Sequence, residues 1–324
     1  MKKSQQLLTI VKNKHLAELE FEPKNQGFLS VPDEYFKQGY LKNCDDAKVI
    51  VIPFALENSV SYGSGTKNGA KAIINASPQL ELYDEEFSCE AFLEYGIITM
   101  KTPKINHNLL EKSLEQLEKI TEKVLKANKF PLILGGEHSI TAGSIRPFVK
   151  KYPNLAILHF DAHADLRDSY DGKHYSHASA LRRVMDHPIS SLVSCGIRNI
   201  SASEIPFLQE NKNQIYMHFA KDKKNWDPKK IVAPLKGKDV FLTFDVDGFD
   251  SGIMQATGTP EPGGMQWEDA LDIIREASKI CNFVGADVVE LAPIKNLHAC
   301  DFLASKLCYK ILNYAFCKPK NLNI

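Results

Sequence analysis

The stretch LAILHFDAHAD, residues 155–165, joins an apolar run to alternating aspartates and histidine. Its first six residues are largely apolar without polar alternation, and they predict a strand buried on both faces of a sheet. Asp161, His163 and Asp165 follow directly. Because extended backbone turns every second side chain to the same side, this spacing predicts that all three point the same way. Two aspartates around a histidine after a buried strand have little structural justification, so they favour a metal site.

Two more groups of possible metal ligands have the same form. PLILGGEHS (131–139) supplies His138 after an apolar run, and VFLTFDVD (240–247) supplies Asp245 and Asp247. Ligands bind beyond the carboxyl ends of the strands in parallel α/β sheets, which is where these residues are expected to converge. A lone His138 is more often a core or helix-start residue. A lone Asp-x-Asp pair also occurs in loops and in glycosyltransferases that hold a metal-bound nucleotide sugar. The three groups together indicate a metal centre.

The ligand types indicate which metal and how many ions. Four carboxylates and two imidazoles suit hard divalent ions such as manganese, with iron, cobalt or nickel as alternatives, better than zinc. Two divalent cations balance the charge of four carboxylates, whereas one cation would leave uncompensated negative charge in a dry cleft. Metal coordination also lowers the pKa of water. The expectation is two Mn²⁺ ions per chain that activate water.

The rest of the chain predicts an α/β fold. Apolar residues recur at spacings of three and four over 108–129, and a helical pattern also covers 267–279. Asn108 and Glu111 resemble a capping box at the start of the first of these helices. Alternation of such helices with non-alternating apolar strands is typical of a parallel sheet covered on both faces, in one domain. The expected strands are 48–54, 97–100, 131–134, 155–160, 192–197, 214–218, 240–244 and 282–289.

Composition places the chain among globular proteins and excludes some functions. Of 324 residues, 44% are hydrophobic, and 40 basic residues balance 40 acidic ones. Zero net charge gives no electrostatic argument for nucleic acid or an anionic membrane as a partner. No apolar run approaches the roughly 18 residues of a membrane span. Residues 1–46 are polar and weakly periodic, and we expect an N-terminal extension that lies on a core formed by 47–324.

Cysteine usage and the N-terminus indicate the cellular compartment. The seven cysteines have no CxxC spacing and fit reduced thiols, and the apolar neighbours of Cys300 and Cys308 favour packing over metal binding. The apolar stretch 7–11 is too short for a secretory signal. A cytoplasmic location is therefore expected.

Five motifs in this chain resemble a known family. GGEHSI, HFDAHADLR, YSHA, FDVDGFD…ATGTPEPGG and DVVELAP are similar, in this order, to the motifs of ureohydrolases, the arginases, agmatinases and relatives that hydrolyse guanidinium groups to urea and an amine. The resemblance runs from about residue 47 to the C-terminus. It implies a three-layer α/β/α fold around an eight-stranded parallel sheet, a binuclear manganese centre and a homo-oligomer, either a trimer or a hexamer. One ion would be held by His138, Asp161, Asp165 and Asp245, and the other by Asp161, His163, Asp245 and Asp247, with Asp161 and Asp245 bridging.

The resemblance also implies catalytic roles. His177, in YSHA, corresponds to a histidine that shuttles protons, and the departing amine needs a proton from a group that titrates near neutrality. Glu290, at the end of FVGADVVE, corresponds to the glutamate that binds the guanidinium, which a carboxylate can orient through paired hydrogen bonds. Burial of such an acid without a cation is unfavourable, which is itself suggestive of function. The metal ligand Asp165 is expected to take part in catalysis with these two residues.

Two segments bear on the substrate. TGTPEPGG (257–264) resembles agmatinases and guanidino-acid hydrolases, whereas arginases more often have a TPVVGG-like sequence. Arginases usually place an asparagine for the amino-acid carboxylate where this chain has Arg167. Arg167 therefore disfavours arginine, although it could attract the carboxylate of a guanidino acid. Asp168 and Asp171 could receive the distal ammonium of agmatine or lie in a solvated loop.

The expected function is hydrolysis of a small guanidino substrate, agmatine, to putrescine and urea, as a step of polyamine biosynthesis. Alternatives within the family are guanidinobutyrate, aminopropylagmatine and arginine. More remote alternatives are a metal-dependent glycosyltransferase and a catalytically inactive binding protein on the same fold.

Overall fold

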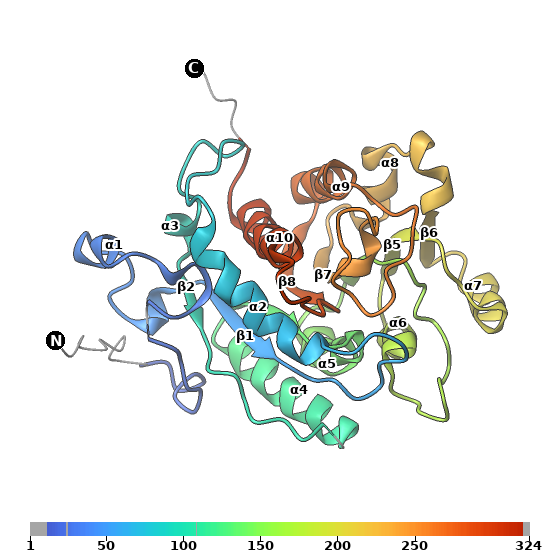
Figure 1. Cartoon of the computed structure of the whole chain (residues 1–324), viewed down its shortest axis with the longest axis horizontal. Coiled ribbons are helices and arrows are strands. Elements are labelled where there is room, and N and C mark those ends of the chain that lie inside the picture. Colours follow the sequence, from blue (N-terminus) through green and yellow to red (C-terminus); the bar gives the residue numbers. More distant parts are fainter. Residues whose placement is uncertain (1–11, 24, 108, 320–324) are drawn as a thin grey trace.

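Eight parallel strands form one sheet through the middle of the molecule (Figure 1). The computed structural model describes residues 12–23, 25–107 and 109–319. All eight predicted strands are confirmed, each to within one residue at either end. They are β1 (Val49–Phe54), β2 (Ile97–Thr99), β3 (Phe130–Gly135), β4 (Leu155–Phe160), β5 (Ser191–Ile197), β6 (Ile215–Phe219), β7 (Asp239–Asp245) and β8 (Asn282–Val289).

The strand order brings together the segments that carry the candidate ligands. The order is β2-β1-β3-β8-β7-β4-β5-β6, so β3, β8, β7 and β4 are neighbours at the centre of the sheet. Their register aligns Leu134, Val288, Phe244 and Phe160 in one row across the four strands. The residues that follow this row therefore leave the sheet at the same edge.

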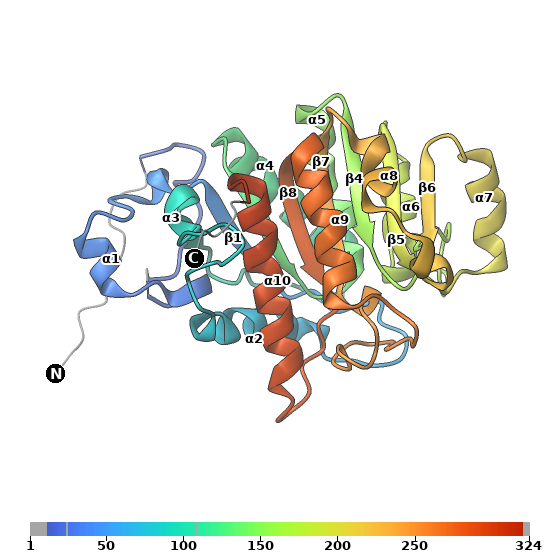
Figure 2. The ribbon, with the colours of Figure 1, turned by 90° about the horizontal axis from the view of Figure 1, so that it is seen from above.

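Helices cover both faces of the sheet, which confirms the predicted three-layer α/β/α fold (Figure 2). One layer contains α4 (Leu110–Lys126), α5 (Thr141–Lys151) and α6 (Ala180–Met185). The other contains α2 (Gly69–Ala76), α8 (Pro228–Val232), α9 (Trp267–Ile280) and α10 (His298–Phe316). Three short helices lie toward the ends of the sheet, namely α1 (Asp33–Lys37), α3 (Phe92–Tyr95) and α7 (Ile205–Glu210).

Both helices predicted from periodicity are present. In α4, Leu114, Leu117 and Val124 are fully buried, as the spacing of three and four requires. Asn108, predicted to cap α4, lies outside the described residues. α9 begins with a capping box, in which the carboxylate of Asp269 accepts a hydrogen bond from the backbone N–H of Gln266 at 2.8 Å.

The described part of residues 1–46 packs against the sheet and its helices. The side chain of Leu16 is fully buried, in the hydrophobic cluster that contains Leu117 of α4. Phe21 pairs with Met100 in an antiparallel bridge, and the backbone N–H of Phe28 donates to Thr99 Oγ1 at 2.9 Å. On these contacts we interpret this segment as an extension packed on a single domain that begins at residue 47.

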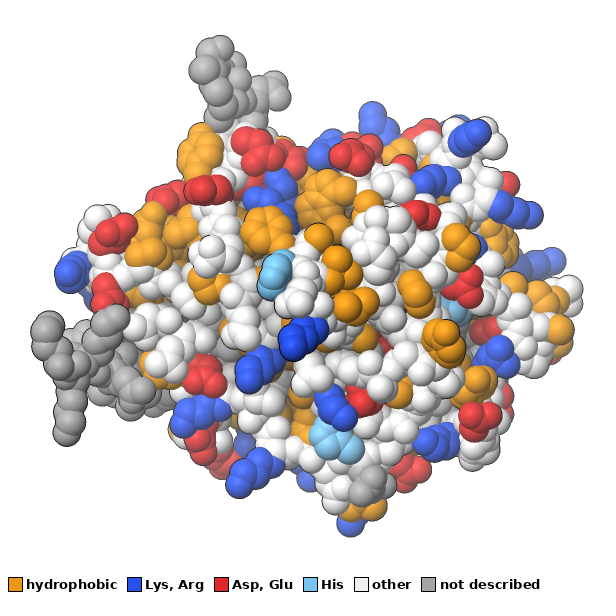
Figure 3. All heavy atoms as spheres, in the orientation of Figure 1, with side chains coloured by type: hydrophobic (Ala, Val, Ile, Leu, Met, Phe, Trp, Pro, Cys, Tyr) orange, Lys and Arg blue, Asp and Glu red, His pale blue; other side chains and the backbone are white. Residues whose placement is uncertain are grey.

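None of the helices in the described residues has the length and apolar character that a bilayer span requires. Basic and acidic side chains are interspersed over the face shown in Figure 3. Cys300 and Cys308 are buried in the core, as their apolar neighbours predict, and their thiols are free.

We predict that Leu16→Ala destabilises the protein by about 2–4 kcal/mol, because the substitution leaves a cavity in place of most of a fully buried side chain. Urea unfolding at equal metal content measures the effect, and Lys14→Ala, at an exposed position two residues earlier, is the control. A Leu16→Ala midpoint equal to that of the control would contradict the packing of this segment on the core.

Candidate metal centre

A cavity of about 210 Å³ lies at the carboxyl edge of the four central strands. Side chains that follow β4, β7 and β8 line it, together with residues of the loops after β1 and β4. Those with candidate roles are His163, Asp165, Arg167, His177, Asp245, Asp247 and Glu290. The fold therefore collects at one place residues that lie more than a hundred positions apart.

His138 is the centre of the first group of candidate ligands. It opens a short 3₁₀ helix, His138–Ile140, directly after β3. Its Nδ1 lies 3.2 Å from Asp161 Oδ2, 3.0 Å from Asp165 Oδ2 and 3.4 Å from Asp245 Oδ2. Its Nε2 is 2.9 Å from the hydroxyl of Thr243, which orients the ring so that Nδ1 faces the carboxylates.

His163 is the centre of a second group, which shares Asp161 with the first. Its Nδ1 lies 3.4 Å from Asp161 Oδ1 and 3.1 Å from Asp247 Oδ2. The ligand atoms of these three residues lie within 4.8 Å of one another. The two oxygens of Asp161 thus face different histidines, the position expected of a bridging ligand. Asp245, the other expected bridge, directs Oδ2 toward His138, while its Oδ1 accepts the backbone N–H of Asp247 at 2.9 Å.

The backbone directs these side chains in a way that period-two spacing does not describe. Asp165 has a φ of 53° and Glu290 a φ of 64°, both in the left-handed region that residues other than glycine rarely adopt. Asp245 caps a 3₁₀ helix that contains Asp247. The prediction that extended backbone aligns the aspartates was therefore wrong for Asp165, although the side chains do converge. Such backbone is retained where the surroundings enforce it, often at functional sites.

The electrostatics of the site fit bound cations. Burial and the nearby charge of Asp161 raise the pKa of Asp165 to about 7, and burial with Asp247 and Asp161 raises the pKa of Asp245 well above its usual range. Burial also favours neutral Asp161, but the adjacent imidazoles of His138 and His159 outweigh it and lower the Asp161 pKa well below its usual range. The protein alone thus does not balance all the buried carboxylates.

An unsatisfied ligand atom supports the same conclusion. His138 Nδ1 is fully buried and forms no hydrogen bond within the described residues, although three carboxylate oxygens lie within 3.4 Å. A buried nitrogen in this state is unfavourable unless another partner is bound. Oxygen ligands with two imidazoles form a donor set that suits hard divalent cations. These residues could therefore hold metal ions.

The sequence did not single out His159, which lies inside the motif. Its side chain is fully buried, with Nε2 at 2.9 Å from Asp161 Oδ2 and Nδ1 at 3.0 Å from Ser194 Oγ. His159, His138 and Asp161 also form a group that could hold a metal. The sequence did contain a signal for His159. It lies two residues before Asp161, and this spacing places both side chains on the same side of extended backbone.

Glu290 and His177 lie in different segments of the chain, and both contribute side chains to the cavity. Glu290 ends β8, and its Oε1 accepts the backbone N–H of His138 at 2.7 Å. Burial and the negative charge of Glu137 raise the Glu290 pKa well above its usual range. His177 opens the 3₁₀ helix His177–Ser179, and burial lowers its pKa. Both side chains line the same cavity as His163, Asp165, Asp245 and Asp247.

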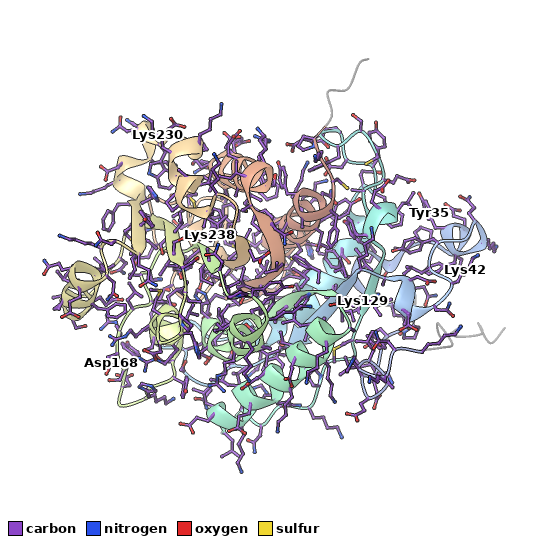
Figure 4. The ribbon with its side chains drawn as sticks, turned by 180° about the vertical axis from the view of Figure 1, so that it is seen from behind. Tyr35, Lys42, Lys129, Asp168, Lys230 and Lys238 are labelled. Carbon is purple, nitrogen blue, oxygen red and sulfur yellow. The ribbon has the colours of Figure 1, made fainter. Side chains whose placement is uncertain are left out.

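Arg167 lines the same cavity, but the aspartates that follow it do not. The Arg167 guanidinium lies 5.2 Å from the centre of the Tyr170 ring. The side chain of Asp168 is 70% exposed and pairs with Arg183 at 3.1 Å, in the outer loop where Figure 4 labels it. Asp168 and Asp171 are outside the cavity lining.

Comparison with known families agrees with this geometry. A family model described as the arginase family matches residues 47–313. The chain belongs to the arginase family. It is 32% identical over 295 residues to the N(1)-aminopropylagmatine ureohydrolase of Synechocystis sp., covering 89% of this chain and 95% of that protein. It is 35% identical over 258 residues to the agmatinase of Bacillus cereus, covering 77% and 85% respectively.

Solved structures show the same arginase-family fold. The agmatine ureohydrolase of Thermoplasma volcanium superposes with a TM-score of 0.74 at 30% identity, covering 84% of this chain and 90% of that one. The protein is thus an arginase-family ureohydrolase, an amidinohydrolase with residues placed to bind metal. Membership in this family assigns the Asp245–Asp247 pair to an amidinohydrolase rather than a glycosyltransferase.

We predict that Asp161→Asn lowers retained divalent metal below two ions per chain and abolishes hydrolysis, because each Asp161 oxygen faces a different ligand group. Elemental analysis after dialysis measures the metal. Asp168→Asn, a matched change at an exposed aspartate in the following loop, should retain the wild-type metal content. Two tightly held ions in Asp161→Asn would contradict the shared position of Asp161.

Proposed function

We propose that this amidinohydrolase hydrolyses agmatine to putrescine and urea with two Mn²⁺ ions per chain. The observation that carries the proposal is the pair of ligand groups joined at Asp161, facing one cavity that also contains Glu290 and His177. In the proposed scheme His138, Asp161, Asp165 and Asp245 hold one ion, and Asp161, His163, Asp245 and Asp247 hold the other. The ions would lower the pKa of water and so supply a nucleophile near neutral pH.

Glu290 is proposed to hold the guanidinium group. The backbone N–H of His138 fixes Oε1, whereas Oε2 receives no hydrogen bond from the described residues and can accept N–H groups of the substrate. A guanidinium presents parallel N–H donors, which a carboxylate binds with defined orientation. The substrate cation would also favour the ionised form of Glu290, whose pKa burial otherwise raises.

His177 is proposed to carry the proton. The amine product is a poor leaving group unless it is protonated, and a positioned histidine can receive a proton at one stage and deliver it at another. Burial lowers the His177 pKa, so the ring is mostly neutral at neutral pH and ready to accept the first proton. Asp165, a member of the His138 group that also lines the cavity, completes the proposed catalytic residues.

The far end of the substrate is the less constrained part of the proposal. Agmatine has no carboxylate, whereas arginine has one, and Arg167 stands where arginases usually have an asparagine that holds this carboxylate. The relatives named above are an agmatinase and an N(1)-aminopropylagmatine ureohydrolase, and aminopropylagmatine is the second candidate substrate. Arg167 forms no ion pair with a described carboxylate, so its guanidinium could pair with the carboxylate of a substrate. A guanidino acid such as guanidinobutyrate is therefore the third candidate substrate. The proposal includes polyamine biosynthesis in the cytoplasm and a homo-oligomer, both on the resemblance to agmatinases.

We predict that kcat/KM for agmatine exceeds that for arginine by at least about 10², the scale of one missing charged recognition contact. Agmatine, aminopropylagmatine, arginine and guanidinobutyrate are compared with manganese present, urea is measured, and the amine product is identified by mass. Ornithine as the main product would overturn the agmatine assignment, and aminobutyrate would mean that Arg167 binds a carboxylate. No urea from any of the four would overturn the function.

His177→Ala should lower kcat by roughly 10²–10⁴ while metal content stays at the wild-type value, because general acid–base catalysis is lost but no ligand is. His174→Ala, three residues earlier and with its ring in contact with the Arg183 guanidinium, is the matched control. Unchanged kcat in His177→Ala would remove this residue from the mechanism.

A further inference from the structure

A buried glutamate outside the metal ligands lies behind His177. Glu137 immediately precedes His138 and is fully buried. Its Oε2 accepts the backbone N–H groups of Asn58 and Ser59, each at 2.6 Å. Its Oε1 receives the hydroxyls of Ser59, at 2.8 Å, and of Ser139. Four donors thus converge on one carboxylate that belongs to no part of the proposed scheme.

Ser59 connects this carboxylate to the imidazole of His177. The Ser59 hydroxyl lies 3.2 Å from His177 Nδ1 and accepts the backbone N–H of His177 at 2.9 Å. Ser59 is itself 7% exposed. Its loop has a separate anchor, because the carboxylate of Glu57 accepts the backbone N–H of Gly65 at 2.7 Å. The contact therefore joins two loops, one after β1 and one after β4, at the edge of the cavity.

The hydrogen-bond count fixes the direction of each bond. A serine hydroxyl has one hydrogen and two lone pairs. Glu137 Oε1 takes the hydrogen of Ser59, and the backbone N–H of His177 takes one lone pair. The remaining lone pair faces His177 Nδ1, so Nδ1 must carry the hydrogen. Nε2, on the other edge of the ring, is then left as the acceptor.

We propose that Glu137, acting through Ser59, holds His177 in the tautomer with hydrogen on Nδ1, so that the bare Nε2 is presented to the cavity. Glu137 and Ser59 are positioning residues, since neither lines the cavity.

The consequence for the reaction rests on the proposed function. A proton shuttle must begin with an unprotonated nitrogen toward the reacting atoms, and the same nitrogen must later release the proton. The wrong tautomer presents a filled N–H where an acceptor is needed, a defect that lowers kcat without removing the histidine. Because Ser59 holds Nδ1, Nε2 can make both transfers while the ring keeps its position.

Two substitutions separate the hydrogen-bond direction from the packing. Glu137→Gln is nearly isosteric, and the two backbone N–H groups require its carbonyl oxygen at the Oε2 position. Its amide nitrogen then faces Ser59 and donates where Oε1 accepted, so the Ser59 hydrogen turns toward His177 Nδ1. This variant should reverse the tautomer. Ser59→Ala removes the link and should give a mixture of both tautomers.

The direct readout is the nitrogen NMR spectrum of the full-length protein labelled with ¹⁵N-histidine, in Mg²⁺, which does not broaden the signals. His177 is assigned by its loss in His177→Gln. The wild type should show hydrogen on Nδ1, Glu137→Gln should show it on Nε2, and Ser59→Ala should lie between them. The control is Ser176→Ala, beside His177, whose hydroxyl bonds Ser179 at 3.0 Å and which should match the wild type. Hydrogen on Nε2 in the wild type, or one tautomer in all variants, would overturn the proposal.

Kinetics with manganese tests the consequence and separates it from the proposed function. We expect kcat to fall about 10-fold in Ser59→Ala and about 10²-fold in Glu137→Gln, with KM and bound metal unchanged. Loss of metal from both variants, with the tautomer unchanged, would mean a structural role only and would overturn the inference. A wild type that releases no urea but shows the expected tautomers would overturn the proposed function and leave the positioning role in place.

Discussion

Buried carboxylates are crowded together at one edge of the sheet. Asp161, Asp165 and Asp245 all place a carboxylate oxygen within 3.4 Å of the same imidazole nitrogen of His138. Like charges at such separations are destabilising unless cations or protons compensate them. The rigid centre of the sheet holds them together, because β3, β8, β7 and β4 are aligned in register. A flexible scaffold would relieve the repulsion by moving apart and would lose the site.

Hydroxyl side chains hold the histidines of the site in place. His138 is bonded to Thr243, His159 to Ser194 and His177 to Ser59. A hydroxyl can donate or accept, so it does not select a tautomer by itself. At Ser59 a buried carboxylate behind the hydroxyl makes the selection, because Glu137 accepts the hydrogen of Ser59.

The sequence predicted the secondary-structure elements of this protein better than the tertiary contacts between them. Local apolar runs determine the strands and α4, and the polar residues just after β3, β4 and β7 are visible without a structure. The order of the strands cannot be seen in the sequence, because the pairing of β3 with β8 joins residues about 150 positions apart. The left-handed backbone of Asp165 is enforced by tertiary contacts that its sequence neighbours do not reveal. The link from Glu137 through Ser59 to His177 depends on two loops that only the fold brings together.

We propose that Asp161 joins two ligand groups into one binuclear centre. Electron paramagnetic resonance of the wild-type protein loaded with Mn²⁺ measures this most directly, because two ions that share a ligand are magnetically coupled. We expect a multiline spectrum of an exchange-coupled pair at two bound ions per chain. A six-line spectrum of isolated Mn²⁺ at saturation would contradict it.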